Sequence, residues 1–443
     1  MVSKKALCVI KMGDRKIFKV VHSNTFGRHI VANRNIEVGE IIIEEYPVVF
    51  GPACNTDESQ DDPNTEPGQV CVGCCCIIDT ETNTSSYKCP SCGLQLCSNV
   101  CHKLELHEQN EYLVFRNCSI ISINPLLTDL KMRYNFILVL RAIFIFIRDP
   151  SSWEKVKTLD SQIPQLNKLG WFDKWKGVFG ILSWKLFGQE DIKCDASIIS
   201  IASHSLGAMR MNGFSHFSKD FSLEGLYFLS ALMSHSCTMN THRQFDQDGL
   251  LVVKAISQIK EGEPITNTYI YALDDKIERQ RSLQSTWLFV CRCFRCTDPT
   301  EYGTYFSTVL CPSCGFLNLN PVNCVNESVW EWACSNETCL FKTHSPDTSI
   351  SRLKCIKNSR PDFNDITKLE AWLSTFNEEK CLHKNHAVFT QVKLQLCQLY
   401  GRNVGVSNLS VADLRRKVSL TMEIDEVFRS WANNASLPFL GQS

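Results

Sequence analysis

The chain has 443 residues, which is too long for one ordinary hydrophobic core and predicts two or three domains. Hydrophobic residues make up 44% and charged residues 21% of the sequence, a balance that excludes a largely disordered chain. The 46 Lys and Arg nearly cancel the 47 Asp and Glu, so no domain-wide positive field favours nucleic acid as the main ligand.

The first residues after Met1 lack the long apolar region of a secretory signal, because Lys11 interrupts a short apolar stretch. The most apolar run, residues 134–147, contains Arg141 and is shorter than the ~20 residues that a membrane-spanning helix needs. We therefore expect a buried helix there and no membrane association. A nuclear or cytoplasmic protein that is not secreted is expected, with cysteines kept as reduced thiols.

The first half of the chain alternates between predicted strands and helices. Residues 15–53 are expected to form a small β unit, with strands at 16–21, 30–32 and 41–45 separated by turns. Residues 54–70 are acidic and rich in Asp, Asn, Thr and Pro, which predicts an exposed linker. A cysteine cluster occupies 71–111, and residues 112–205 show helical periodicity with four tryptophans.

The second half begins with short apolar segments between turns, at 250–256 and 264–270, so strands are expected again within residues 206–290. Residues 291–345 hold the remaining cysteine groups. From 346 to 443 the spacing of apolar residues predicts helices, and no repeat in this region is clean enough to assign.

The 24 cysteines need an explanation other than disulfides in a reducing compartment, and metal binding is the expected one. Most of them fall in three tight groups, at 71–101, 291–296 and 311–339. Eight others stand singly and are treated as small apolar residues, at positions 8, 54, 118, 194, 324, 355, 381 and 397.

The first cluster offers seven zinc donors at finger-like spacing. They are Cys71, Cys74, Cys89, Cys92, Cys97, Cys101 and His107. A Cys-x2-Cys turn points two thiolates at one Zn²⁺, so seven donors predict two sites of which one lacks a ligand. We expect the eighth to be Glu111, with His102, Cys75 and Cys76 as alternatives. Simple burial of these thiols is the competing interpretation, and three closely spaced pairs weigh against it.

The second cluster supplies three thiolates within six residues, from Cys291, Cys293 and Cys296, and therefore needs a fourth donor from elsewhere. The third has the shape of a zinc ribbon. Its donors are Cys311, Cys314, Cys334 and Cys339, and Cys324 or His344 could compete with them. All these zinc ions, three or four in total, are expected to be structural, since no site keeps an open position for catalysis.

Three segments resemble one known family when they are taken together. They are residues 234–240 (SHSCTMN), residues 262–269 (GEPITNTY) and the Cys-x-Cys-x2-Cys run at 291–296. Their order and spacing resemble the SET domain and its post-SET cysteines, and Phe26–Ile30 resembles the N-terminal SET loop. The first cysteine cluster resembles a MYND finger. This layout is similar to that of the SET-and-MYND protein lysine methyltransferases, and of their arthropod branch in particular.

The resemblance implies an α+β fold. A SET-domain β fold would be split by the inserted finger and a helical insert, and followed by a post-SET zinc site and a C-terminal helical region. It also implies S-adenosyl-L-methionine as cofactor, Tyr269 as the catalytic residue and Cys237 as the fourth ligand of the post-SET zinc. The implied cofactor contacts are Gly27, Arg28, Asn212, Ser234, His235 and Phe289.

The reaction implied is methyl transfer to a lysine amine of a histone or another protein. A lysine in water has a pKa of about 10.4, so it must be desolvated or lose its proton before it attacks. Tyr269 would orient the amine, and Phe289 and Tyr271 would face cationic groups with their rings. The finger is a candidate site for a partner peptide, and the protein is expected to be a monomer.

The sequence also departs from the family pattern. Ser234 replaces an Asn, His29 the second Gly of the first loop, Met239 a Pro, Pro264 a Glu, and Glu111 the last finger cysteine. These changes leave open a second hypothesis, an inactive adaptor that binds partner proteins, for instance in transcriptional regulation. A DNA-binding finger protein is the third, which the net charge of −1 disfavours.

Overall fold

The computed structural model describes residues 17–24, 26–54, 69–78, 87–115, 127, 129–187, 198–218, 220–246, 248–326, 329–344, 348–362, 364–378, 381–402 and 405–434. The chain forms two compact units. The first comprises residues 1–30, 40–233 and 243–254, and the second comprises residues 31–39, 234–242 and 255–443. Most of the predicted acidic linker lies outside the described residues.

Most of the strands in the first half of the chain form small sheets. β1 (Phe18–Ser23) lies beside β2 (Gly27–Ala32), and β4 (Val49–Pro52), β10 (Ser222–Leu226) and β9 (Gly213–Phe217) form a second sheet in that order. β13 (Leu251–Ala255) lies between β12 (Thr241–Phe245) and β3 (Ile41–Glu45). The strands predicted at 30–32, 41–45 and 250–256 are confirmed as parts of β2, β3 and β13.

The finger region has little regular structure of its own. Two short hairpins pair β5 (Gln69–Val70) with β6 (Ile77–Ile78) and β7 (Tyr87–Lys88) with β8 (Gln95–Leu96). The helical turns α1 (Asn99–His102), α2 (Glu105–His107), η1 (Glu108–Tyr112) and α3 (Leu113–Phe115) follow. Elements this short bury little apolar surface, so metal ligation is the expected source of their stability.

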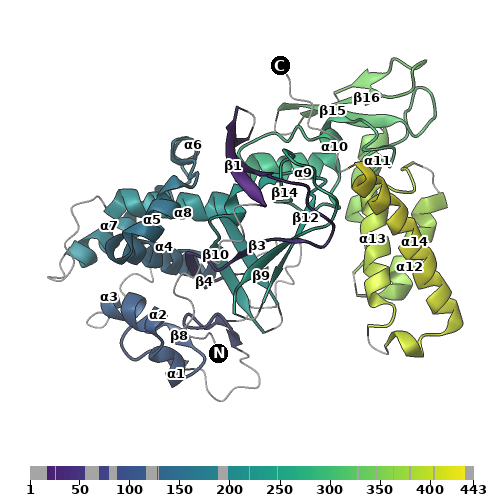
Figure 1. Ribbon diagram of the computed structural model, residues 1–443. Helices are drawn as coiled ribbons and strands as arrows, with labels where there is room; N and C mark the ends of the chain where they lie inside the picture. Colours follow the sequence, from purple (N-terminus) through teal and green to yellow (C-terminus); the bar gives the residue numbers. More distant parts are fainter. Residues whose placement is uncertain are drawn as a thin grey trace. The chain divides into compact units, whose positions relative to one another are not determined.

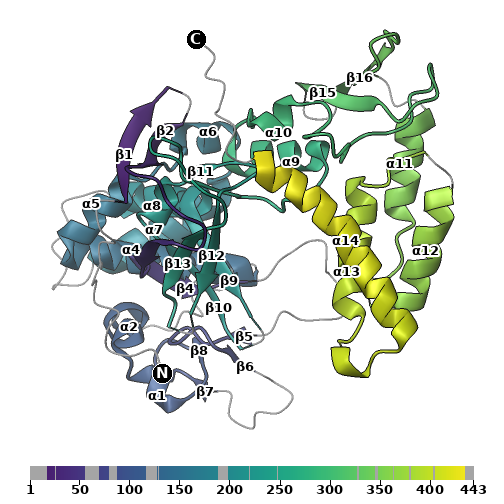
Figure 2. The ribbon, with the colours of Figure 1, turned by 45° about the vertical axis from the view of Figure 1, so that its right-hand side comes forward.

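The described helical segments that follow in the first unit are α4 (Leu130–Arg148), α5 (Pro150–Thr158), α6 (Ile163–Lys168), η3 (Asp173–Trp175), α7 (Lys176–Phe187), α8 (Ile198–Asn212) and the short η4 (Ser230–Leu232). Figures 1 and 2 show α4, α5, α7 and α8 side by side. The Asp129 carboxylate caps α4 by accepting a hydrogen bond from the Met132 N–H at 2.7 Å. The helix predicted from the apolar run is confirmed as α4, which is buried along most of its length. None of the described helices is long and apolar enough to cross a membrane.

The second unit starts from a parallel pair of two-residue strands, β11 (Ser234–His235) and β14 (Thr266–Asn267). We expect a longer strand at 264–270, but only Thr266 and Asn267 form a strand, and Pro264 makes an isolated bridge to Val31. The reason is Asn240, whose side chain accepts from the Thr266 N–H at 2.7 Å and donates to the Pro264 carbonyl at 2.9 Å. A side chain thus takes the hydrogen bonds that a neighbouring strand would make.

The rest of the second unit holds the remaining elements. Short helices α9 (Lys276–Ser282), η5 (Leu283–Trp287) and α10 (Phe294–Thr297) precede a sheet of β15 (Leu319–Asn326), β16 (Val329–Cys334) and β17 (Lys342–Thr343). Next come α11 (Thr348–Asn358), α12 (Ile366–Glu378), α13 (Ala387–Leu399), η6 (Val406–Asn408) and α14 (Val411–Asn434). The predicted C-terminal helices are confirmed, and the fold is α+β as expected.

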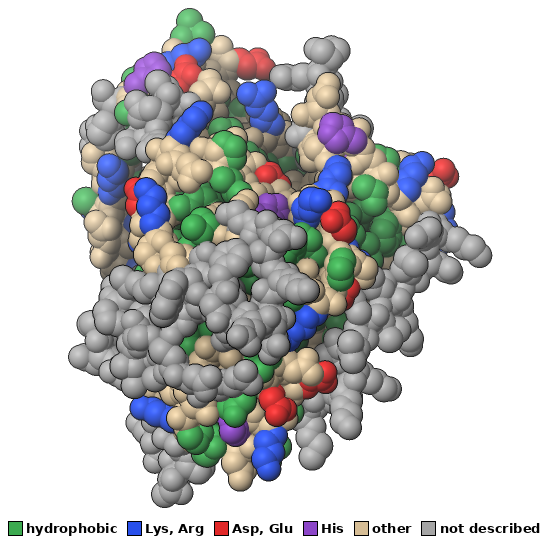
Figure 3. All heavy atoms as spheres, turned by 90° about the vertical axis from the view of Figure 1, so that its left-hand side faces the viewer, with side chains coloured by type: hydrophobic (Ala, Val, Ile, Leu, Met, Phe, Trp, Pro, Cys, Tyr) green, Lys and Arg blue, Asp and Glu red, His purple; other side chains and the backbone are tan. Residues whose placement is uncertain are grey.

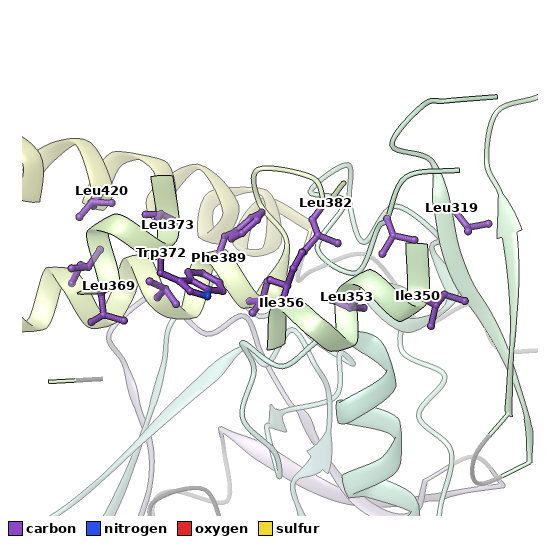
Figure 4. Packing of buried hydrophobic residues seen from close by; sticks show 14 of the residues in the cluster. Leu319, Ile350, Leu353, Ile356, Leu369, Trp372, Leu373, Leu382, Phe389 and Leu420 are labelled. Carbon is purple, nitrogen blue, oxygen red and sulfur yellow. The ribbon is translucent and has the colours of Figure 1, made fainter. Parts of the chain in front are cut away.

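Buried side chains at helical spacing hold the C-terminal helices together. In α11 they recur every third residue, at Ile350, Leu353 and Ile356; Figure 4 shows Ile356 near Phe389 of α13 and Ile350 toward Leu319 of β15. All five are less than one-tenth exposed. This continuous apolar core makes α11 to α14 a packed helical layer rather than a set of independent helices.

Charged side chains show no segregation on the face of the molecule drawn in Figure 3, where Lys and Arg are interspersed with Asp and Glu. Among the coloured side chains no single-sign patch stands out. This distribution agrees with the net charge of −1 and gives no support to a nucleic-acid-binding surface on that face.

Candidate metal centres and active site

The first metal centre of the finger is a group of four thiols. The Sγ atoms of Cys71, Cys74, Cys97 and Cys101 all lie within 4.8 Å of one another. Shared hydrogen bonds within the group lower the pKa of Cys71 and raise the pKa of Cys74 and of Cys101. Four thiolates at this spacing suit a tetrahedral Zn²⁺.

The second metal centre of the finger contains both thiols and imidazoles. Cys89, His102 and His107 bring their donor atoms within 4.8 Å of one another. The Sγ atom of Cys92 lies 3.7 Å from Nε2 of His107. Cys92 is outside this group of three and approaches it through His107.

Glu111, the expected eighth ligand, is not in that group. Its Oε2 lies 3.2 Å from Nδ1 of His107, and its Oε1 accepts from Nε of Arg141 at 2.7 Å. Both carboxylate oxygens are therefore engaged away from the thiols. Of the alternatives that the spacing leaves open, the structure brings His102 to the other donors.

The post-SET cysteines form the most buried centre. Cys237, Cys291, Cys293 and Cys296 bring their Sγ atoms within 4.8 Å of one another, and all four side chains are buried. Hydrogen bonds from the other three thiols lower the pKa of Cys237 well below its usual value. The Gln280 side chain fixes the Cys291 backbone, donating to its carbonyl at 2.8 Å and accepting from its N–H at 2.9 Å. The group expected from the resemblance is thus assembled.

Two fully buried arginines flank this centre. Nη2 of Arg279 lies 3.8 Å from Sγ of Cys296, and Glu301 joins Arg279 at 2.9 Å to Arg295 at 2.8 Å. The Arg295 guanidinium also lies 3.7 Å from the centre of the Trp431 ring in α14. Positive charge beside four thiolates offsets the net negative charge of a zinc site made of four cysteines.

The ribbon donors also meet as predicted. The Sγ atoms within 4.8 Å of one another are those of Cys311, Cys314, Cys334 and Cys339. His344, the alternative donor, is exposed and is not in the group. The side chain of Cys324 lies outside the described residues.

The candidate catalytic tyrosine is tied to the post-SET centre through His235. Nδ1 of His235 accepts from the Tyr269 backbone N–H at 3.1 Å, so its Nε2 carries the proton and donates to Sγ of Cys237 at 3.3 Å. The Tyr269 ring lies 5.5 Å from the Trp287 ring, and the His235 ring lies 6.0 Å from Phe289. His235 therefore links the position of the Tyr269 backbone to that of the metal centre.

The chemistry of Tyr269 follows from its surroundings. Burial raises the pKa of Tyr269 to about 12, so the phenol stays protonated at neutral pH and serves as a hydrogen-bonding group. Nearby, Ser234 is 8% exposed and pairs with Thr266 across β11 and β14. The Nδ2 of Asn267 is buried without a hydrogen-bond partner among the described residues, which marks a donor available to a bound molecule.

Three of the implied cofactor contacts belong to the first unit, namely Gly27, Arg28 and Asn212. Gly27 adopts a φ of +62° that favours glycine. Nη2 of Arg28 donates to the carbonyl of Thr158. Nδ2 of Asn212 donates to two carbonyls, those of Asp160 at 2.7 Å and Ala208 at 2.9 Å.

The other implied contacts, Ser234, His235 and Phe289, belong to the second unit with Tyr269. His29, at the position of the family's second Gly, is 4% exposed, and its Nδ1 lies 3.1 Å from the Gly27 carbonyl. Tyr271, an expected aromatic neighbour, is 54% exposed. The aromatic side chain that lies against Tyr269 is Trp287, and no sequence motif pointed to this tryptophan.

Comparison with known proteins agrees with this geometry. The SET domain family matches residues 27–270. SET domain-containing protein SmydA-8, isoform B, of Drosophila melanogaster is 26% identical over 317 residues, which cover 70% of this chain and 65% of that protein. Histone-lysine N-methyltransferase SMYD3 of Homo sapiens is 31% identical over 153 residues, 33% of this chain and 35% of that protein. These matches confirm the resemblance to SET-and-MYND proteins.

A solved structure described as Rubisco LSMT bound to AdoMet aligns with 95% of this chain and 87% of its own, at 12% identity and a TM-score of 0.35. The chain spans less than two thirds of the length of the Drosophila relatives, 65% of isoform B and 60% of isoform A.

Proposed function

Because the chain belongs to the SET-domain family, we propose that it transfers a methyl group from S-adenosylmethionine to lysine side chains of proteins. One observation carries the proposal. The His235 ring accepts from the Tyr269 backbone and contacts Cys237 of a buried four-cysteine centre, so a metal ion there would hold the tyrosine in a fixed place.

Bound S-adenosylmethionine would supply a methyl group on a positively charged sulfonium. The chain's own task is to bring a neutral lysine amine to that methyl in line, and positioning of this kind accounts for much of an enzyme's acceleration. With a pKa of about 12, the Tyr269 phenol keeps its proton. It orients the amine through a hydrogen bond and does not act as the base.

Aromatic rings favour the same chemistry. The Trp287 ring centre lies 5.5 Å from that of Tyr269, and Phe289 follows two residues later. Ring faces attract cations, so this cluster suits both an incoming lysine and a sulfonium. Contact with these rings would also strip water from the amine and thereby lower its pKa.

We assign the cofactor contacts to Gly27, Arg28, Asn212, Ser234, His235 and Phe289. The two Asn212 amide hydrogens already have carbonyl partners, so this side chain would contact the cofactor through its oxygen. The His235 ring nitrogens are likewise engaged, which leaves its backbone. Asn267 is added to the set, because its buried Nδ2 has no partner among the described residues.

We extend the proposal to the substrate and setting of the reaction. Several relatives carry the name histone-lysine N-methyltransferase, so a histone tail is the first substrate to test and another protein lysine the second. A partner peptide at the finger, a monomeric state and a nuclear or cytoplasmic location complete the proposal. Light scattering of the purified protein and imaging of a fluorescent fusion test the last two.

Calorimetric titration of the zinc-loaded full chain with S-adenosylmethionine tests the cofactor assignment. The wild type is expected to release heat with one-to-one stoichiometry, and Phe289→Ala to weaken binding because a ring face is lost. Tyr271→Ala is the matched control, since this aromatic side chain is 54% exposed and should leave binding unchanged. An absence of heat from correctly loaded wild type would refute the enzyme proposal.

The second candidate is a catalytically inactive adaptor. Two observations favour it: His29 stands in place of a loop glycine, and the Arg28 side chain is already engaged by Thr158. Zinc-loaded protein that binds no S-adenosylmethionine yet captures a defined partner peptide through its finger would establish the adaptor and exclude the enzyme.

A further inference from the structure

We propose that the second metal site of the finger has the ligand set Cys89, Cys92, His102 and His107, and that Glu111 supports His107 without binding the metal. This inference concerns the finger alone and does not depend on the methyltransferase proposal. It replaces the carboxylate ligand expected from the spacing with an imidazole.

The turn at Cys89 has the backbone geometry of a metal-binding knuckle. The Cys89 N–H donates to the Leu94 carbonyl at 3.0 Å, the Gly93 N–H donates to the Cys89 carbonyl at 2.8 Å, and Gly93 has a φ of +74°. The same pattern recurs at Cys71, where Cys75 has a φ of +61°, and at Cys311, where Gly315 has a φ of +72°.

All three turns therefore share one backbone form, and in the other two it belongs to a complete group of four thiols. The turn at Cys89 and Cys92 is thus built like a metal site, but its two thiols need two further donors.

Both missing donors are histidines. Nε2 of His107 lies 3.7 Å from Sγ of Cys92, and the ligand atoms of His102, His107 and Cys89 lie within 4.8 Å of one another. His102 ends α1, and its ring is held between Tyr87 at 6.1 Å and Tyr112 at 5.5 Å. Contacts with two aromatic rings restrict the positions that the His102 imidazole can take.

Glu111 plays a different part. It lies one helical turn after His107, and its carboxylate accepts from Nδ1 of that ring. Protonation at Nδ1 leaves the lone pair of His107 on Nε2, the atom that faces Cys92. A carboxylate behind a metal-bound histidine fixes the tautomer and raises the ligand's basicity.

The charges favour the same arrangement. Two thiolates and two neutral imidazoles balance Zn²⁺, and the Glu111 carboxylate is already paired with the Arg141 guanidinium, both almost fully buried. Were Glu111 to rotate onto the metal, Arg141 would keep a buried charge without its carboxylate. Arg141 also donates to the carbonyls of Phe50 at 2.8 Å and Val72 at 2.6 Å, so the pair anchors the finger to β4 and α4.

Cadmium substitution tests the ligand set in the unmodified protein. The full chain is loaded with ¹¹³Cd, its histidines are labelled with ¹⁵N, and couplings between metal and nitrogen are recorded by NMR. We expect couplings to two imidazoles, those of His102 and His107. Coupling to a single histidine would overturn the proposal.

Two variants then separate ligand from support, with zinc counted per chain. His102→Ala should lose one of the four zinc ions that the donor groups accommodate. Glu111→Gln should keep all four but release one about 10- to 100-fold more readily to a chelator. His242→Ala, an exposed histidine, is the control and should match the wild type. Loss of one zinc from Glu111→Gln together with full occupancy in His102→Ala would overturn the assignment.

Discussion

Glu301 is the group whose replacement most sharply tests the account of the post-SET centre. Its carboxylate is the only acidic group with a described ion pair to Arg279 or Arg295, at 2.9 and 2.8 Å, and all three side chains are no more than 1% exposed. Glu301→Gln keeps the shape of the side chain and removes its charge. Two buried guanidinium groups would then lose their carboxylate.

Removing one partner of a buried ion pair costs about 3–5 kcal/mol. The thiolate of Cys296, whose Sγ lies 3.8 Å from Arg279, offsets part of the buried positive charge that has lost its carboxylate. We therefore expect a loss on the order of 3 kcal/mol in the free energy of unfolding of the zinc-loaded chain, at the lower end of that range.

Urea unfolding measures the loss, and hydrogen exchange of the amides in α9 and α10 locates it. Asp425→Asn is the matched control, because Asp425 pairs with Arg429 at 2.6 Å with both side chains exposed. A surface pair of this kind contributes roughly 0–1 kcal/mol. If Glu301→Gln destabilises the chain no more than Asp425→Asn does, the reasoning is refuted.

The same carboxylate gives a pH dependence with a definite sign. Burial raises the pKa of Glu301, but the charges of Arg279 and Arg295, together with hydrogen bonds to the carboxylate, lower it by more, so the net shift is downward. Its contribution to stability is therefore present above the unfolded value of about 4.3 and is lost as the pH falls through the folded value. The difference between wild type and Glu301→Gln should shrink in acid and persist at neutral pH.

Three further predictions concern the tyrosine, a buried acid and the metals. His235→Phe keeps the ring but removes the acceptor for Tyr269 and the contact to Cys237, so kcat should fall with zinc retained; steady-state kinetics with an unchanged kcat would contradict this. Burial raises the pKa of Glu45 to about 7. The protonated side chain therefore contributes fully to the stability of the fold below about pH 4.3, and this contribution is lost as the pH rises through the folded pKa of about 7. Glu45→Gln should therefore lose less free energy of unfolding than the wild type between about pH 5 and about pH 8. Urea unfolding at both pH values measures this, and an equal loss in the two proteins would contradict it. Chelation should remove on the order of 10 kcal/mol per site and unfold the finger; circular dichroism that stays unchanged after zinc release would contradict a structural role.

The metal donors were largely predictable, because a Cys-x2-Cys turn is a local feature of sequence. Cys237 was not, since it stands alone, and only the order of motifs in the family placed it with Cys291. His102 and Glu111 could not be separated by spacing. The choice between them depends on Arg141, a residue of α4 that no local pattern connects to the finger.

The active site was less predictable for the same physical reason. Tyr269 and His235 were found through motifs, but the hydrogen bond between them joins distant segments and is visible only in the fold. Nothing in the sequence around Arg279 and Glu301 indicates that they are buried or that they pair, because charged residues are usually exposed. The side-chain partners of Arg28 and Asn212 are likewise carbonyls far along the chain.

Transfer of labelled methyl groups measures the proposed activity itself. The zinc-loaded chain is incubated with S-adenosylmethionine that carries a deuterated methyl group and with an array of lysine peptides that includes histone tails, and the products are identified by mass spectrometry. We predict label on lysine side chains with the wild type and none with Tyr269→Phe, whose zinc content stays the same. Absence of label from wild type that binds the cofactor, or undiminished transfer by Tyr269→Phe, would contradict it.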